Sequence, residues 1–179
     1  MIYVALLRGI NVGGNNKVSM KELKTLLDSL GFKNVSTYIN SGNIIFESTA
    51  KDTNKITQKI EAGIKENFGL TIRVLVRDSK NIEKLCKALP AKWTNNTKMR
   101  TEIMFLWESM DSPSVIKKLK INPVDTVKHI AGTVVWNFDR KDYNKSALPK
   151  IIGTEFYKNM TARNINTVRK LNQLMSAKK

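Results

Sequence analysis

The chain has 179 residues, of which 41% are hydrophobic and 26% are charged, and its formal net charge is +16. This composition is typical of a globular protein, and the apolar runs are far shorter than the roughly 20 residues of a membrane helix, which argues against a membrane protein. A single cysteine, Cys86, excludes an internal disulfide framework and predicts a reducing, cytoplasmic location.

The first predicted elements are a strand, a glycine-rich loop and a helix. Residues 2–8 are almost all apolar, as expected for a strand buried on both faces. Ser19 followed by Glu22 three residues later is a capping box, which predicts that a helix begins there. Gly31 is expected to end that helix, because glycine readily adopts the left-handed conformation of a C-cap.

The remainder of the first half completes a β-α-β-β-α-β order. A hairpin is predicted from strands 35–39 and 44–46, and a helix that ends at Gly69 precedes a strand at 71–76. This order is that of a ferredoxin-like unit. We therefore predict a ferredoxin-like half over residues 1–78.

The same order is predicted a second time after a linking segment. Residues 79–99 are expected to form a linking helix, with Cys86 on its apolar side, and a polar loop. Residues 100–179 then predict a second ferredoxin-like half and a C-terminal helix. The signals are a strand at 102–107, a helix start at Ser112-Pro113, a hairpin at Ala131-Gly132 and a closing helix at about 161–175 capped by Thr161. The predicted fold class is α+β, in one compact unit with two ferredoxin-like halves.

The loop from Arg8 to Lys17 is the first candidate functional site. A glycine-rich turn between a strand and a helix can present several backbone N–H groups to an anion. Neither the phosphate-loop pattern G-x-x-x-x-G-K-[ST] nor G-x-G-x-x-G is present, and the alternative is a tight connection that needs positive φ angles. The candidate ligand contacts here are Arg8, Asn11, Gly13, Gly14 and Lys17.

Two further polar segments are candidates. The predicted hairpin turn contributes Tyr38, Asn40, Ser41 and Asn43, although polar side chains in a turn often only satisfy the turn backbone. The predicted start of the last helix contributes Arg163, Asn164, Asn166 and Thr167. A helix N-terminus favours anions, but these side chains could equally attach the helix to the rest of the fold.

No set of residues predicts a metal site, a cofactor or a catalytic group. His129 is the only histidine, so a zinc site or a histidine-based dyad has no partners that the sequence identifies. The RNA-recognition signature of aromatic and glycine residues is absent as well. The catalytic residues, if any, stay unknown, and no cofactor is expected.

Several strings resemble the family called domain of unknown function 1697. They are Val4 to Gly14, the helix residues Met20 and Leu23, Thr37 to Asn43, and Thr161 to Val168. The resemblance implies an uncharacterised bacterial protein of ferredoxin-like α/β architecture. It supplies no activity, cofactor or catalytic residue.

The net charge favours an acidic partner, and three hypotheses follow for function. The first is a binding protein for a phosphate-bearing ligand, including nucleic acid, held by the three polar segments. The second is an enzyme that acts on a small phosphorylated or nucleotide-like substrate through the same electrostatics. The third is that the polar segments are purely structural. Lysine outnumbers arginine and the positive surplus is spread along the chain, so charge alone does not distinguish them.

Overall fold

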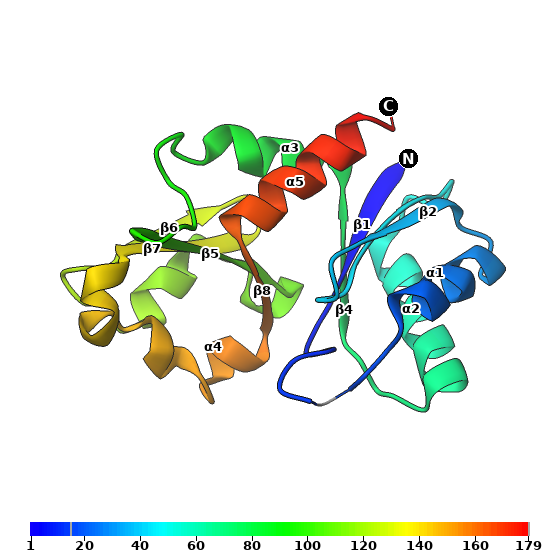
Figure 1. Cartoon of the computed structure of the whole chain (residues 1–179), viewed down its shortest axis with the longest axis horizontal. Coiled ribbons are helices and arrows are strands. Elements are labelled where there is room, and N and C mark those ends of the chain that lie inside the picture. The colour runs from blue at the N-terminus through cyan, green and yellow to red at the C-terminus, as the bar shows by residue number, and fades with distance from the viewer. Residues whose placement is uncertain (15, 179) are drawn as a thin grey trace. The chain divides into compact units, whose positions relative to one another are not determined.

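The computed structural model describes residues 1–14 and 16–178, and its strands form two separate sheets, each accompanied by helices (Figure 1). The chain divides into two compact units, each described here by itself. Unit 1 contains Met1–Ile82 together with the described residues from Leu171 onward, and unit 2 contains Glu83–Lys170. The chain leaves unit 1 within helix α3 (Ser79–Ala88) and returns to it within helix α5 (Ile165–Ser176).

Unit 1 contains a four-stranded antiparallel sheet and two α-helices. In chain order its elements are β1 (Ile2–Leu7), α1 (Met20–Ser29), β2 (Lys33–Tyr38), β3 (Asn43–Glu47), α2 (Thr53–Phe68) and β4 (Val74–Asp78). The strand order is β2-β3-β1-β4, and every neighbouring pair is antiparallel. The predicted β-α-β-β-α-β order of the first half is therefore confirmed, as is the α+β class of the fold.

The local signals in the sequence explain where the helices of unit 1 begin and end. Ser19 Oγ accepts a hydrogen bond from the Glu22 backbone N–H at 3.3 Å, which confirms the predicted cap of α1. Gly69 ends α2 with a left-handed φ of 66°. All six residues of β1 are buried, and alternate residues such as Tyr3 and Leu7 pack with the apolar stripes of α1 and α2 to form one core.

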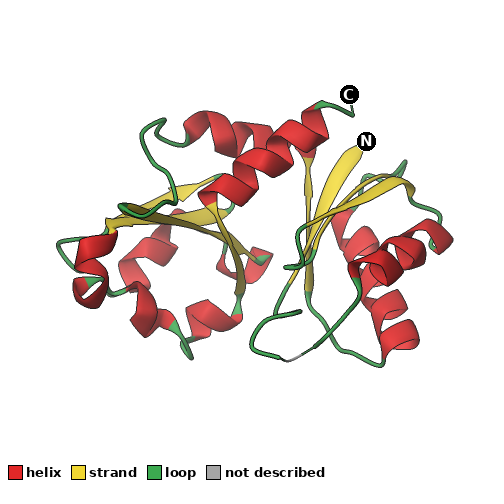
Figure 2. Ribbon diagram, in the orientation of Figure 1, coloured by secondary structure: helices red, strands yellow, loops and turns green. Residues whose placement is uncertain are grey.

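Unit 2 repeats the strand order of unit 1 with shorter connections (Figure 2). Its elements are β5 (Met99–Leu106), the 3₁₀ helices η1 (Glu108–Met110) and η2 (Pro113–Lys118), β6 (Thr126–Ile130), β7 (Thr133–Asp139), the 3₁₀ helices η3 (Arg140–Lys145) and η4 (Leu148–Ile151), α4 (Glu155–Lys158) and β8 (Met160–Asn164). The order is β6-β7-β5-β8, again antiparallel throughout. Short 3₁₀ segments and the four-residue helix α4 therefore stand where unit 1 has its two long α-helices.

Two local predictions for unit 2 are confirmed. Ser112 caps η2 by accepting from the Ser114 N–H at 3.2 Å, although the helix that follows is 3₁₀ rather than α. Ala131 and Gly132 form a two-residue hairpin loop, and both have the positive φ angles, 47° and 78°, that such a tight turn requires.

The predicted helix over 161–175 is wrong in its first turn. Residues 160–164 form the edge strand β8, in which Thr161 pairs with Phe105 and Arg163 with Ile103. The cap of α5 is Asn164 rather than Thr161, because Asn164 Oδ1 accepts from the Thr167 N–H at 2.9 Å. Pairing with β5 decided the conformation here, and the local residues carry no strand-like alternation of apolar side chains.

No helix within residues 1–14 and 16–178 is a candidate for crossing a membrane. Every helix in those ranges is too short or too polar to cross a bilayer.

Candidate functional site

The glycine-rich loop after β1 is tied to the turn between β2 and β3. The side chain of Asn11 makes the connection, because its Nδ2 donates to Val18 O and to Asn40 O, both at 2.9 Å. Its Oδ1 accepts from the Val18 N–H at 2.9 Å. Two of the three polar segments that the sequence singled out therefore meet within unit 1.

The loop needs left-handed backbone at several positions. Gly9, Gly13 and Gly14 have φ angles of 68°, 61° and 80°, and Asn11 has 53°, a conformation that asparagine tolerates better than most residues. Asn16 Nδ2 donates to Gly9 O at 3.0 Å, and so links the end of the loop to its beginning. These bonds give the loop a defined shape just beyond the end of β1, an interior strand of the sheet.

A surface pocket of about 560 Å³ lies where this loop, the start of α1 and the β2–β3 turn come together. We call it the glycine-loop pocket. Its lining residues are Asn11, Gly14, Lys17, Val18, Ser19, Met20 and Asn40. Lys17 is exposed and supplies a positive charge, and the first backbone N–H groups of a helix such as α1 carry a partial positive charge. The pocket is therefore suited to a small anion or to the anionic group of a larger ligand.

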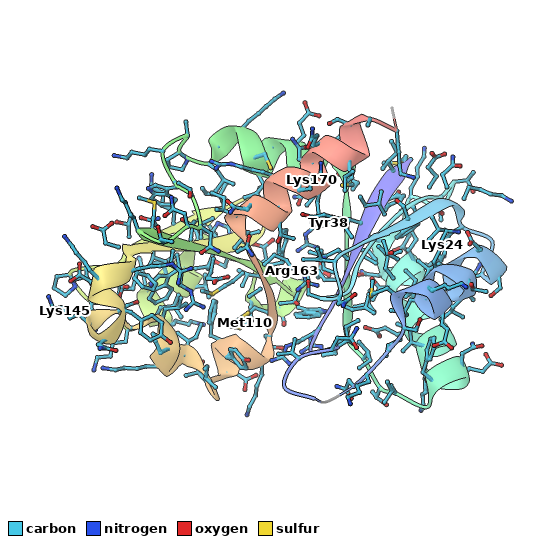
Figure 3. All side chains as sticks on the ribbon, viewed as in Figure 1. Lys24, Tyr38, Met110, Lys145, Arg163 and Lys170 are labelled. Carbon is cyan, nitrogen blue, oxygen red and sulfur yellow. The ribbon has the colours of Figure 1, made fainter. Side chains whose placement is uncertain are left out.

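Other predicted contacts in unit 1 lie outside the pocket lining. Asn43 is fully buried, and its Nδ2 donates to Tyr38 O at 2.9 Å and to Ser41 Oγ at 3.1 Å. These bonds hold the turn in which Asn40 sits, and Figure 3 labels Tyr38 at the end of β2. Arg8 is half-buried, and its backbone N–H donates to Arg73 O at 3.0 Å, while Gly13 is exposed.

The third predicted segment belongs to unit 2. Arg163, labelled in Figure 3 on β8, is only 7% exposed, and its Nη1 donates to Ala162 O at 2.7 Å and to Thr161 Oγ1 at 3.1 Å. Burial lowers the pKa of Arg163 to about 10, so the side chain stays charged at neutral pH.

The three companions of Arg163 have structural contacts within unit 2. Asn164 caps α5, and Thr167, which donates to that cap, is buried. Asn166 Nδ2 donates to Asn95 O at 2.8 Å, which attaches the polar loop before β5 to the start of α5.

The single histidine and the single cysteine of the chain show no arrangement for catalysis in the described residues. His129 Nε2 lies 2.8 Å from Asp111 Oδ1. Burial raises the pKa of the Cys86 thiol to about 11, against a smaller opposing effect of Arg169, so this thiol is largely protonated at neutral pH. In the part of the chain that the structure describes, no three histidine, cysteine or acidic side chains lie together as metal ligands would.

Sequence reasoning missed part of the pocket lining and the cavities of unit 2. Ser19 was identified only as a helix cap, although capping residues often line anion sites. A cavity of about 240 Å³ in unit 2 contains the ion pair of Arg100 Nε and Glu102 Oε1, 2.9 Å apart, beside Tyr143. Arg100 and Glu102 are two residues apart on β5, so their side chains lie on the same face of the strand. This spacing of opposite charges was the sequence signal that could have identified the ion pair.

Asn11→Asp is expected to reduce the free energy of unfolding by about 1–2 kcal/mol. The change keeps the shape of the side chain but replaces its N–H donors with a carboxylate oxygen that faces Val18 O and Asn40 O. Denaturant unfolding followed by circular dichroism measures the loss. Asn54→Asp, at the exposed start of α2, adds the same charge and should leave stability nearly unchanged. Equal effects of the two variants would show that the Asn11 bridge is unimportant.

The chain is similar to a family of proteins and to a solved structure. The sequence model of the family described as "Protein of unknown function (DUF1697)" matches residues 1–136, a stretch that includes the whole glycine-loop pocket and ends before Arg163. The solved structure of a conserved bacterial protein from Streptococcus pneumoniae is similar over nearly the full length. It has 31% sequence identity and a TM-score of 0.84, and the alignment covers 97% of this chain and 98% of that chain. A search of curated proteins found no match.

Proposed function

We propose, for a chain that belongs to the DUF1697 family of proteins of unknown function, that unit 1 binds a phosphate-bearing ligand in the glycine-loop pocket. The observation that carries the proposal is the convergence of Lys17, the N-terminus of α1 and the side chain of Asn40 on one hollow, whose walls the fully bonded Asn11 side chain holds together. A phosphate accepts several hydrogen bonds at once and carries the charge that both Lys17 and the helix N-terminus favour.

The size and chemistry of the pocket favour binding of a small molecule. Its volume of about 560 Å³ lies within the range of roughly 300–1,000 Å³ that is usual for small-molecule sites. Among the lining residues that the structure describes, Lys17 is the only ionisable side chain, and none is a carboxylate or histidine that could transfer protons. We therefore favour a binding role over catalysis, with a nucleotide or sugar phosphate as the ligand class.

The net charge of +16 supports nucleic acid as an alternative source of the phosphate. The two sources make different predictions. A nucleic acid spread over a broad basic surface would bind with a steep salt dependence and would depend little on any one lysine. A small phosphorylated ligand in the glycine-loop pocket would depend strongly on Lys17.

Lys17→Gln is expected to weaken binding of a nucleoside triphosphate by about tenfold or more, because a charge-assisted hydrogen bond contributes about 1.5–3 kcal/mol. Isothermal titration at low salt with inorganic phosphate, nucleoside mono- and triphosphates and a short mixed-sequence RNA provides the measurement. Lys21→Gln is the matched control, because Lys21 is an exposed residue of α1 outside the pocket lining.

Two results would contradict the proposal. One is the absence of binding by every phosphate compound at low salt. The other is equal loss of affinity in the Lys17 and Lys21 variants, because general charge would then explain the binding.

A further inference from the structure

The two units differ in what covers the apolar face of their sheets. In unit 1, α1 and α2 pack closely, and a Cβ placed at Gly63 of α2 would lie only 3.3 Å from Leu26 Cδ1 and 3.0 Å from Leu30 Cδ1. In unit 2 the corresponding connections contain η2 on one side and η4 with α4 on the other. These short segments leave a cavity of about 410 Å³ between them, which we call the unit 2 cavity.

The inner wall of the unit 2 cavity is apolar. Val115, Ala147, Ile151 and Phe156 line it, and all four belong to the buried core that also contains Trp136. Met110, labelled in Figure 3, and Leu119 are partly buried and extend the apolar wall outward. An apolar ligand group that enters here would therefore continue the core of the unit and lose its contact with water.

The mouth of the cavity is positively charged. The exposed lysines Lys118, Lys120 and Lys150 line it, and none of the three forms an ion pair within the described part of the chain. Glu155 is the one carboxylate among the described lining residues. Its Oε1 accepts from Asn159 Nδ2 at 2.7 Å, and its Oε2 lies 4.0 Å from Lys158 Nζ. The lysines therefore leave a net positive charge at the mouth.

We infer that the unit 2 cavity binds a small amphipathic anion, with its apolar chain against Val115, Ile151 and Phe156 and its anionic head at Lys118, Lys120 and Lys150. Both the apolar wall and the charged mouth are needed for this ligand class. An inorganic anion would leave the wall empty, and a neutral apolar molecule would leave the lysines without a counter-charge. The inference is independent of the glycine-loop pocket, which lies in unit 1.

The chain-length series octanoate, decanoate and dodecanoate tests the apolar part. Each pair of added methylenes should tighten binding by about tenfold while the chain still fits, because each buried methylene has a similar transfer free energy. Decyl phosphate should bind as decanoate does, whereas decanol and decyltrimethylammonium should bind at least tenfold more weakly. Backbone amide NMR should place the largest shifts at Val115, Leu119, Ala147 and Phe156.

The triple variant Lys118→Gln, Lys120→Gln and Lys150→Gln tests the charged part and should weaken decanoate binding by about tenfold or more. The matched control replaces Lys92, Lys98 and Lys141, three exposed lysines of unit 2 outside the cavity, so that the net charge falls equally. Equal binding by the two triple variants would overturn the inference. So would the absence of decanoate binding, equal binding of the cationic decyl compound, or NMR shifts confined to other surfaces.

Leu119→Trp gives a second readout, because the larger side chain fills a partly exposed position in the cavity wall. It should abolish decanoate binding while it leaves phosphate binding by unit 1 unchanged. If decanoate still binds this folded variant with wild-type affinity, the cavity is not the site. Lys17→Gln should leave decanoate binding unchanged, so the two proposals can fail separately.

Discussion

Gly42→Ala is expected to lower the free energy of unfolding of unit 1 by about 3 kcal/mol or more, because two unfavourable terms add. Gly42 has a φ of 76°, which costs an alanine about 1–2 kcal/mol. An added Cβ would also lie 2.7 Å from Leu7 Cβ and 2.8 Å from Ile10 Cδ1, closer than carbon atoms can approach. Either the β2–β3 turn or the start of the glycine-rich loop must move.

Gly69→Ala separates the steric term from the backbone term. Gly69 has a similar φ of 66°, but no neighbouring atom lies within 4 Å of a Cβ placed there. This variant should therefore lose only about 1 kcal/mol. Amide hydrogen exchange in β1 and β3 reports the local stability of unit 1, and equal exchange rates in the two variants would exclude a close approach at Gly42.

Asp125→Ala is expected to lower the free energy of unfolding of unit 2 by about 3 kcal/mol. The carboxylate joins the segment before β6 to β7 and to the segment after η3. Its Oδ1 accepts from Trp136 Nε1 at 2.9 Å and from Ser146 Oγ, and its Oδ2 accepts from the N–H groups of Ala147 at 2.9 Å and Asn122 at 3.1 Å. Trp136 and Ser146 are buried, so their donors would lose their partner in a place that water reaches poorly.

The contribution of Asp125 should depend on pH. Burial acts to raise the pKa of its carboxyl, but the hydrogen bonds from Ser146, Ala147, Trp136 and Asn122 together outweigh burial and lower that pKa below its ordinary value. A lowered folded-state pKa stabilises the protein above the unfolded-state pKa of about 3.9, and the stabilisation is lost as pH falls through the folded-state value. The stability difference between wild type and Asp125→Ala should therefore shrink below about pH 4.

Tryptophan fluorescence during urea unfolding follows this loss, because all three tryptophans, Trp93, Trp107 and Trp136, lie in unit 2. Asp139→Ala is the control, since its side chain is 54% exposed and its nearest cation, Lys141, is 3.8 Å away. That exposed pair should contribute less than about 1 kcal/mol. A loss of the same size in both variants would show that the Asp125 hydrogen bonds add no particular stability.

Most of unit 1 follows from signals that act within a few residues. The Ser19 cap, the left-handed Gly69 and the apolar stripes of two long helices predict elements that the structure contains. The β2–β3 hairpin is equally local, because Tyr38 and Asn43 pair across a four-residue turn. For these elements the preferred local conformation and the final packing agree, so pattern and propensity suffice.

The sequence predicted the residues of one candidate site but not the contacts that bring them together. The polar residues of the glycine-rich loop and the hairpin turn were identified, but the bond from Asn11 to Asn40 joins residues 29 positions apart. The unit 2 cavity gave no sequence signal, because it results from how η2, η4 and α4 cover the sheet. Its charged mouth also combines lysines from separate segments, Lys118 and Lys120 with Lys150.

The sequence by itself determined the α+β class, the element order of unit 1 and the glycines that end its helices, since each depends on near neighbours along the chain. It did not predict the left-handed φ of 51° at Ile39, which lies at the end of the predicted strand 35–39. Only the tertiary structure decided that residues 160–164 form strand β8 instead of the first turn of a helix. It also decided that short 3₁₀ segments and α4 replace the long helices in unit 2, and that two polar segments of unit 1 share a pocket. The physical reason is that strand pairing and cavity formation depend on distant segments, whose contacts outweigh local preferences of only a few tenths of a kcal/mol per residue.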